Sequence, residues 1–166
     1  ESFIKDNSDW GNISTLETVA LGHENGTATM KVPNTTNTGM ASLVHEPKQK
    51  TGDRWVQPEW ENFPKIQVKT KTLDSYNFNQ LDFIKMDVEW FELKVLQGAE
   101  NTIRKHKPIM YIEMSDSEAY TYIKDLDLGY RSLYAHGADR LYKVDTSHEW
   151  KQHIKKIDNL KDILNK

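Results

Sequence analysis

The chain of 166 residues contains no cysteine. This absence excludes disulfide bonds, thiolate-bound zinc and cysteine nucleophiles. No run of apolar residues approaches the length of about 18 that a membrane-spanning helix needs. Acidic and basic residues number 25 and 22, so the chain lacks the basic excess that is typical of nucleic-acid binding. We therefore expect no nucleic-acid partner, no membrane partner and a cytoplasmic location.

Apolar residues are also few, at 37% of the chain, although there are five Trp and seven Tyr. The aromatic content is too high for a disordered acidic chain. The low apolar fraction indicates a large ratio of surface to core, as in a piece of a larger fold, and the first residue is Glu1 rather than Met. We therefore expect one domain over residues 1–166 that is incomplete at its N-terminus.

The first half of the sequence predicts strands. Residues 14–21 and 27–32 each have the pattern of a strand, and the Asn25-Gly26 pair between them is typical of a tight hairpin. Residues 46–64 form a long polar loop. Residues 65–73 alternate Lys with apolar side chains or Thr, which predicts a half-exposed strand near the edge of a sheet.

The second half contains the strongest pattern. Residues 82–88 are a short apolar run that predicts a buried strand, residues 89–106 have helical spacing, and residues 109–114 are a second apolar run. Strand, helix and strand in this order form a βαβ unit with parallel strands, so we expect an α/β fold. Further elements are predicted for residues 117–126 (helix), 130–134 and 140–144 (strands) and 147–166 (C-terminal helix).

Acidic residues follow the two parallel strands. Ligands of open parallel sheets bind at the carboxyl ends of the strands, and Asp87, Glu89 and Glu113 lie at these ends. Carboxylates there can orient a hydroxyl, accept its proton or hold a cation. The alternative for Asp87 is a structural role as the N-cap of the helix that follows. No spacing of metal ligands such as His-Glu-x-x-His appears, so we name no metal site.

A polar loop supplies two further candidates. Asn37 and Ser42 have side chains that can bind a ligand, and turn formation is the alternative role for both. The sequence has no Gly-rich phosphate loop and no Gly-x-Ser-x-Gly elbow.

The stretch from Lys85 to Ala99 resembles the characteristic motif of FkbM-type methyltransferases, K-(I/M)-D-(V/I)-E-G-x-E-x-x-x-L-x-G-A. Four further landmarks resemble those of the family and come in the family's order. They are Val19-Ala20-Leu21-Gly22, Asn37-Thr38-Gly39 with Ser42-Leu43, Thr72-Leu73-Asp74-Ser75, and Lys107 to Glu113. Together the five landmarks cover about residues 16 to 114.

This resemblance implies a Rossmann-like class I methyltransferase sheet with helices on both faces, here lacking the first strands. It implies S-adenosylmethionine as the cofactor and a hydroxyl of a sugar or small molecule as the methyl acceptor. By the same resemblance, Ala20 and Leu21 would flank the adenine, and Asp87 would lie near the methyl donor. Asp87, Glu89 and Glu113 are the candidate catalytic residues.

One motif position departs from the family. Trp90 stands where the family has Gly, and this Trp would fill the pocket, stack on a ligand or turn outward. We expect Asn37, Ser42 and Trp90 to contact the substrate. The alternative function is a non-catalytic, truncated Rossmann-like module that binds a partner or a glycan. Missing strands would leave sheet edges open, so a homo-oligomer is also an expectation.

Overall fold

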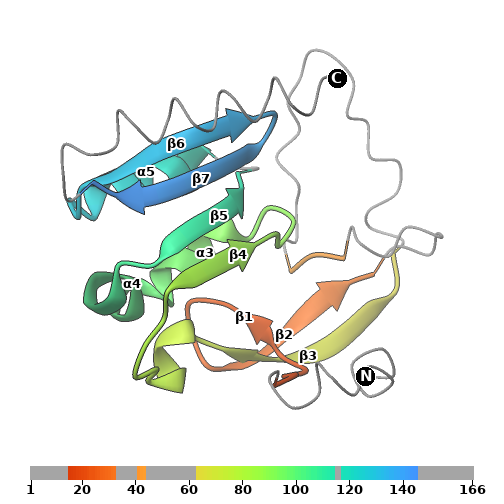
Figure 1. The fold of residues 1–166 in the computed structure, drawn as a ribbon. Helices are drawn as coiled ribbons and strands as arrows, with labels where there is room; N and C mark the ends of the chain where they lie inside the picture. Colours follow the sequence, from red (N-terminus) through yellow and green to blue (C-terminus); the bar gives the residue numbers. More distant parts are fainter. Residues whose placement is uncertain (1–14, 33–40, 44–62, 115–116, 146–166) are drawn as a thin grey trace, which may run out of the picture.

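The computed structural model describes residues 15–32, 41–43, 63–114 and 117–145, which form a mixed α/β structure (Figure 1). Its strands are β1 (Ala20–Leu21), β2 (Gly26–Lys31), β3 (Lys65–Lys71), β4 (Phe83–Met86), β5 (Ile109–Glu113), β6 (Tyr130–His136) and β7 (Asp139–Val144). Its helices are the 3-10 helix η3 (Leu73–Tyr76) and the α-helices α3 (Glu92–Gln97), α4 (Glu100–His106) and α5 (Ser117–Asp125). The predicted α/β class is confirmed.

Three predicted features lie wholly or mostly outside the described residues. They are the C-terminal helix of residues 147–166, the polar loop of residues 46–64 and the candidate Asn37. None of the described helices is long and apolar enough to cross a membrane.

The smaller sheet has the strand order β1-β3-β2, which corrects two predictions. The predicted hairpin between residues 14–21 and 27–32 is wrong, because β1 pairs in parallel with β3 while β2 pairs antiparallel with the other side of β3. β3 is therefore the central strand and not an edge strand. The Asn25 side chain, expected to serve a hairpin turn, instead accepts a hydrogen bond from the Thr72 backbone N–H at 2.8 Å and ties the turn to the end of β3.

The larger sheet has the order β4-β5-β7-β6 and contains the predicted βαβ unit. β4 and β5 are parallel, as predicted. The single helix predicted for residues 89–106 is instead two helices, α3 and α4, which separate at Gly98. A β-carbon at Gly98 would lie 1.9 Å from the carbonyl oxygen of Gly22, so the helical segment approaches the β1 turn as closely as only glycine permits.

Asp74 caps the second of these helices from another part of the chain. The residue that precedes α4 has no side-chain hydrogen bond to the helix. The Asp74 carboxylate accepts hydrogen bonds from the backbone N–H groups of Thr102 at 2.7 Å and Asn101 at 3.1 Å. It thus satisfies two of the free donors that every helix N-terminus has.

The hydrophobic core lies between the larger sheet and its helices. In Figure 1, α3, α4 and α5 all lie on one face of this sheet. The buried side chains that fill the space between them are Met86, Val95, Leu96, Ala99, Ile103, Met110, Ile112, Ala119, Ile123 and Tyr142. The expected second layer of helices is not found among the described residues. β4 is less buried than predicted, since Phe83 is 52% exposed.

Candidate functional site

The register of the larger sheet brings the predicted carboxylates together. Met86 of β4 is aligned with Ile112 of β5, so Asp87 and Glu113, which follow these residues, come side by side. Glu113 is in turn paired with Asp139 at the start of β7. Because side chains alternate between the faces of a strand, these carboxylates lie on the face opposite the helices.

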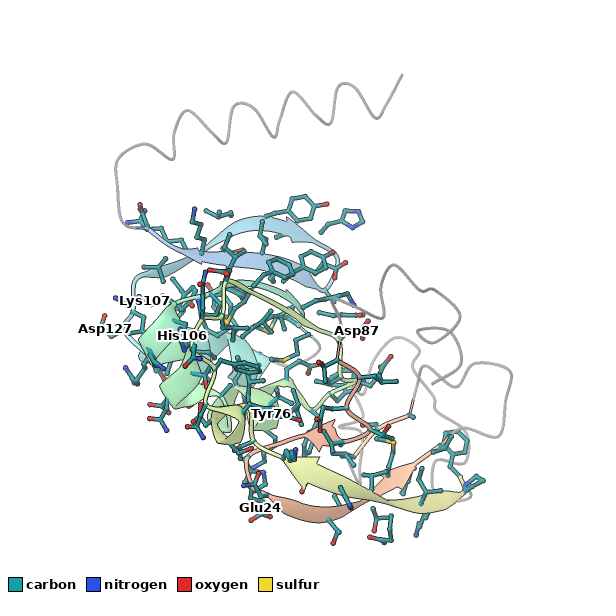
Figure 2. All side chains as sticks on the ribbon, turned by 60° about the horizontal axis from the view of Figure 1, so that its bottom comes forward. Glu24, Tyr76, Asp87, His106, Lys107 and Asp127 are labelled. Carbon is teal, nitrogen blue, oxygen red and sulfur yellow. The ribbon has the colours of Figure 1, made fainter. Side chains whose placement is uncertain are left out.

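Figure 2 shows where Asp87 lies in the molecule. It is at the end of the larger sheet away from His106 and Lys107, which precede β5. This is the carboxyl end of the parallel strands, where ligands of α/β sheets bind.

The grouped carboxylates alter one another's ionisation. Burial raises the pKa of Glu113, and the nearby charges of Asp87, Glu89 and Asp139 raise it further. Burial also raises the pKa of Glu89, to which the Asp87 charge adds. A raised pKa makes an ionised carboxylate a stronger base, which suits a group that accepts a proton from a hydroxyl.

Asp87 does not serve as the helix N-cap. The residue at the N-cap of α3 is Phe91, and no side chain makes a capping hydrogen bond there. Asp87 instead forms an ion pair with Lys85, in which the distance between Asp87 Oδ2 and Lys85 Nζ is 3.2 Å. Both side chains are largely exposed, so this ion pair contributes little to stability. The structural alternative for Asp87 is therefore wrong, and its carboxylate remains accessible.

The turn after β4 has an unusual backbone. Glu89 and Trp90 have φ angles of +48° and +73°, in the left-handed region. The buried Ser42 Oγ donates a hydrogen bond of 2.7 Å to the Glu89 carbonyl. Ser42 thus lies beside the candidate site and its hydroxyl holds the turn, whereas substrate contact by Ser42 stays a prediction. Trp90 is 45% exposed, so it does not fill a pocket.

A pocket of about 380 Å³ is lined by all of β4 and by Asp87 and Val88, which follow it. This volume is in the range of small-molecule sites, ~300–1,000 Å³. Its lining is mainly apolar and consists of Leu21, Leu73, Phe78, Leu81, Phe83, Ile84, Lys85, Met86, Asp87, Val88 and Val95. The predicted cofactor residues Leu21 and Asp87 both line it. Ala20 does not, and its role stays a prediction.

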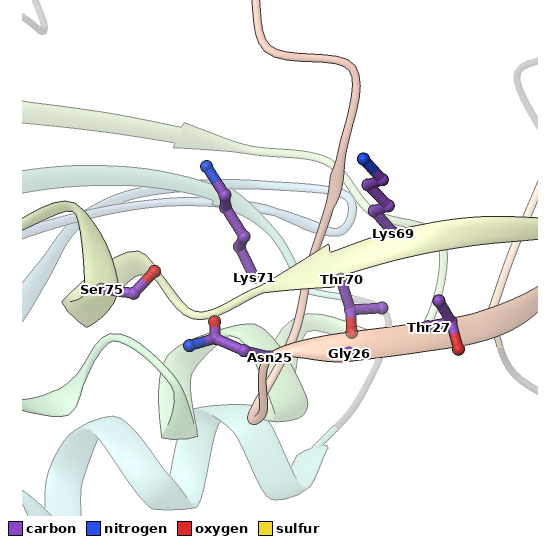
Figure 3. A pocket seen from close by; sticks show the side chains of 7 residues that line it. All are labelled: Asn25, Gly26, Thr27, Lys69, Thr70, Lys71 and Ser75. Carbon is purple, nitrogen blue, oxygen red and sulfur yellow. The ribbon is translucent and has the colours of Figure 1, made fainter.

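A second, larger hollow of about 630 Å³ lies in the smaller sheet, where the start of β2 meets the end of β3 (Figure 3). Lys69 and Lys71 extend to the same side of β3, away from Thr70. Lys71 is paired with Glu17, 3.3 Å between Nζ and Oε2, and lies over the Tyr76 ring. Because Lys71 and Asn25 of this hollow serve contacts within the chain, we place the candidate site at the carboxylates.

Two residues of the carboxylate face were missed at the sequence level. Asp139 contacts Glu113 across the sheet, and it also forms a hydrogen bond with Tyr111, whose pKa is raised first by burial and then by this bond. The sequence predicts two strands on either side of Gly137, which indicates a hairpin. It does not indicate that the second of these strands pairs with β5.

Within the described ranges of the chain, no group of three or more His, Asp or Glu side chains is arranged to hold a metal ion.

The family model of the methyltransferase FkbM domain matches residues 5–133. No curated protein and no solved structure matches the chain significantly. The matched range includes the Asp87 turn, Glu113 and Leu21, whereas Asp139 lies beyond it. Because the match spans most of the 166 residues, the chain belongs to the FkbM methyltransferase domain family and is, at the family level, a methyltransferase.

Proposed function

We propose that this protein transfers a methyl group from S-adenosylmethionine to a hydroxyl oxygen of a sugar or another small molecule. We further propose that its larger sheet is part of a Rossmann-like class I methyltransferase sheet. Family membership supports the reaction class. The observation that carries the proposal is a mainly apolar pocket whose lining includes Asp87, next to Glu113 at the carboxyl end of parallel strands.

The residues of the pocket fit the cofactor. Leu21 and Val88 provide apolar surface for a flat adenine ring, and Asp87 adds a carboxylate to the lining. A carboxylate there attracts a positively charged sulfonium and accepts hydrogen bonds from ribose hydroxyls. When bound, the cofactor supplies an electrophilic methyl group.

The carboxylates of this chain position and deprotonate the acceptor. Asp87, Glu89 and Glu113 offer hydrogen-bond acceptors to the hydroxyl, which orients its oxygen for in-line displacement. As the oxygen gains the methyl group it loses its proton, and a neighbouring carboxylate accepts it. Glu113 suits this role best, because burial and three neighbouring carboxylates raise its pKa and so make its ionised form a stronger base.

The cofactor step is tested by isothermal titration of the protein with S-adenosylhomocysteine. We expect binding, and we expect Leu21→Asn to weaken it at least tenfold because a polar group would line the apolar pocket. Leu16→Asn is the matched control, since Leu16 is 50% exposed and lies outside the pocket. Absence of binding at millimolar ligand would refute the proposed cofactor.

The transfer step is tested by mass spectrometry of methyl transfer to a panel of methyl glycosides. The double variant Asp87→Asn with Glu89→Gln, and the single variant Glu113→Gln, are each expected to lower the rate by about 10²-fold or more. Asp125→Asn, on the exposed side of α5, is the control and should retain the rate. Unchanged transfer by the carboxylate variants would show that the site is placed wrongly.

A further inference from the structure

Trp90 occupies a backbone position that suits glycine. Its φ angle is +73°, and it follows Glu89 at +48°. Left-handed backbone costs conformational energy for any residue with a side chain, and bulky residues are rare there. The motif that this stretch resembles has Gly at the same position. The chain therefore places Trp, the largest side chain, at a position whose backbone conformation favours glycine.

Packing does not account for this choice. Val88 and Phe91, on either side of the turn, are half-buried and pack against the hydrophobic core. Trp90 does not belong to that group of side chains, and it is 45% exposed. A strained residue that the core does not need is a reason to look for a function.

The turn is held in place beside the candidate site. Ser42, which is remote in sequence, donates its hydroxyl to the Glu89 carbonyl at 2.7 Å. The Glu89 carboxylate interacts electrostatically with Asp87 and with Glu113. Trp90 thus directly follows Glu89, whose backbone Ser42 holds and whose carboxylate is one of those proposed to bind the acceptor.

We propose that Trp90 is a specificity-determining residue of the acceptor site, whose indole face packs against the apolar face of a pyranose ring. This inference rests on the proposed function, because it assigns Trp90 to recognition of the methyl acceptor. An indole offers a large flat contact area with few rotatable bonds, so ordering it costs little entropy. The neighbouring carboxylates accept hydrogen bonds from hydroxyl groups. An acyclic polyol has the same hydroxyls but no flat face, so Trp90 discriminates against it.

The test is fluorine NMR of the protein labelled with 5-fluorotryptophan. The chain contains five Trp, and the Trp90→Phe variant identifies the Trp90 resonance by its loss. The probes are the methyl α-glycosides of glucose, galactose, mannose and rhamnose, with sorbitol as the acyclic comparison. We expect at least one glycoside to shift the Trp90 resonance selectively, with a dissociation constant on the order of millimolar. Sorbitol at the same concentration is expected to leave it unchanged.

Variants separate stacking from a structural role. Saturation-transfer NMR of the bound glycoside should show roughly three- to tenfold weaker binding to Trp90→Ala, with binding largely retained by Trp90→Phe, which keeps an aromatic face. Tyr120→Ala is the matched control, since Tyr120 is an aromatic side chain of α5 that is 43% exposed. Equal binding by Trp90→Ala and the parent protein would overturn the inference, as would an equal shift with sorbitol or no shift with any glycoside.

Titration with S-adenosylhomocysteine distinguishes the failure of this inference from that of the proposed function. If the cofactor product binds but no glycoside shifts Trp90, the role of Trp90 is refuted and the methyltransferase proposal stands. If a glycoside shifts Trp90 but the cofactor product does not bind, the sugar site stands and the methyl transfer is refuted.

Discussion

Replacement of Gly98 by Ala is expected to destabilise the protein strongly, although Ala favours helices by about 1 kcal/mol over Gly. Gly98 is buried between α3 and α4. A β-carbon there would lie 1.9 Å from the Gly22 carbonyl oxygen, where real contacts are not under 3.0 Å, so the two segments must separate by about 1.1 Å. Because the clash is with backbone rather than with a flexible side chain, the cost lies near the upper end of overpacking, about 3 kcal/mol. The net loss, the overpacking cost minus the helix-propensity gain, is then about 2 kcal/mol.

The measurement is urea unfolding followed by circular dichroism, in which the midpoint falls while the slope is unchanged. The corresponding loss of melting temperature is about 4–8 °C for a chain of this size. Gly26→Ala is the matched control, because the nearest atom to a β-carbon there is Thr70 Oγ1 at 3.8 Å, and its stability should equal or slightly exceed that of the parent. A Gly98→Ala protein within about 0.5 kcal/mol of the parent would refute the close approach of these segments.

Gly98→Ala also links stability to the proposed site. Gly22 directly follows Leu21, which lines the pocket beside β4. Separation of Gly22 from the helices would therefore move Leu21. We expect Gly98→Ala to weaken binding of S-adenosylhomocysteine under conditions in which the variant is still folded, whereas Gly26→Ala should bind as the parent does.

Three further predictions follow from the same structure. Trp90→Gly should be more stable to urea than Trp90→Ala by about 1 kcal/mol, the reverse of the usual order, because φ is +73°; the usual order would contradict this backbone. Asp74→Ala should lower the free energy of unfolding by about 1–2 kcal/mol, because it removes the cap of α4; no loss would mean that the cap is dispensable. The folded-state pKa of Glu113 lies above its ordinary value of 4.5, so ionisation of Glu113 destabilises the fold as pH rises through the folded pKa. Glu113→Gln should therefore raise the melting temperature at pH 8 but not near pH 4, and a difference that does not vary with pH would exclude this coupling.

Much of the candidate site could be predicted because it depends on local pattern and one general rule. The apolar run before Asp87 and the one that ends at Glu113 predict strands, and the helix between them predicts parallel pairing. Parallel strands bring their carboxyl ends to one edge, so the meeting of Asp87 and Glu113 follows from the order of elements. Asp139 was not predicted, because its position depends on the pairing of β7 with β5. The sequence of the hairpin does not indicate which strand β7 pairs with.

The wrong predictions concern contacts between remote segments. Helical periodicity continues through Gly98, but in the structure the helix breaks at this residue, where Gly22, which follows β1, packs against it. The Asn25-Gly26 pair has the chemistry of a hairpin turn, yet β3 lies between the two strands that this turn was expected to join. In both cases the local preference is about 1 kcal/mol, which a tertiary contact easily outweighs.

The sequence by itself determined the α/β class, the exclusion of thiol chemistry, the resemblance to one methyltransferase family and the pairing of Asp87 with Glu113, because period, composition and motif are properties of neighbouring residues. The tertiary structure alone decided the strand order, the cap of α4 by Asp74, the apolar pocket between Leu21 and β4, and the exposure of Trp90. These features depend on contacts between segments that are far apart in the sequence. The arrangement of those segments is the one that minimises the free energy of the whole core, not that of any single segment.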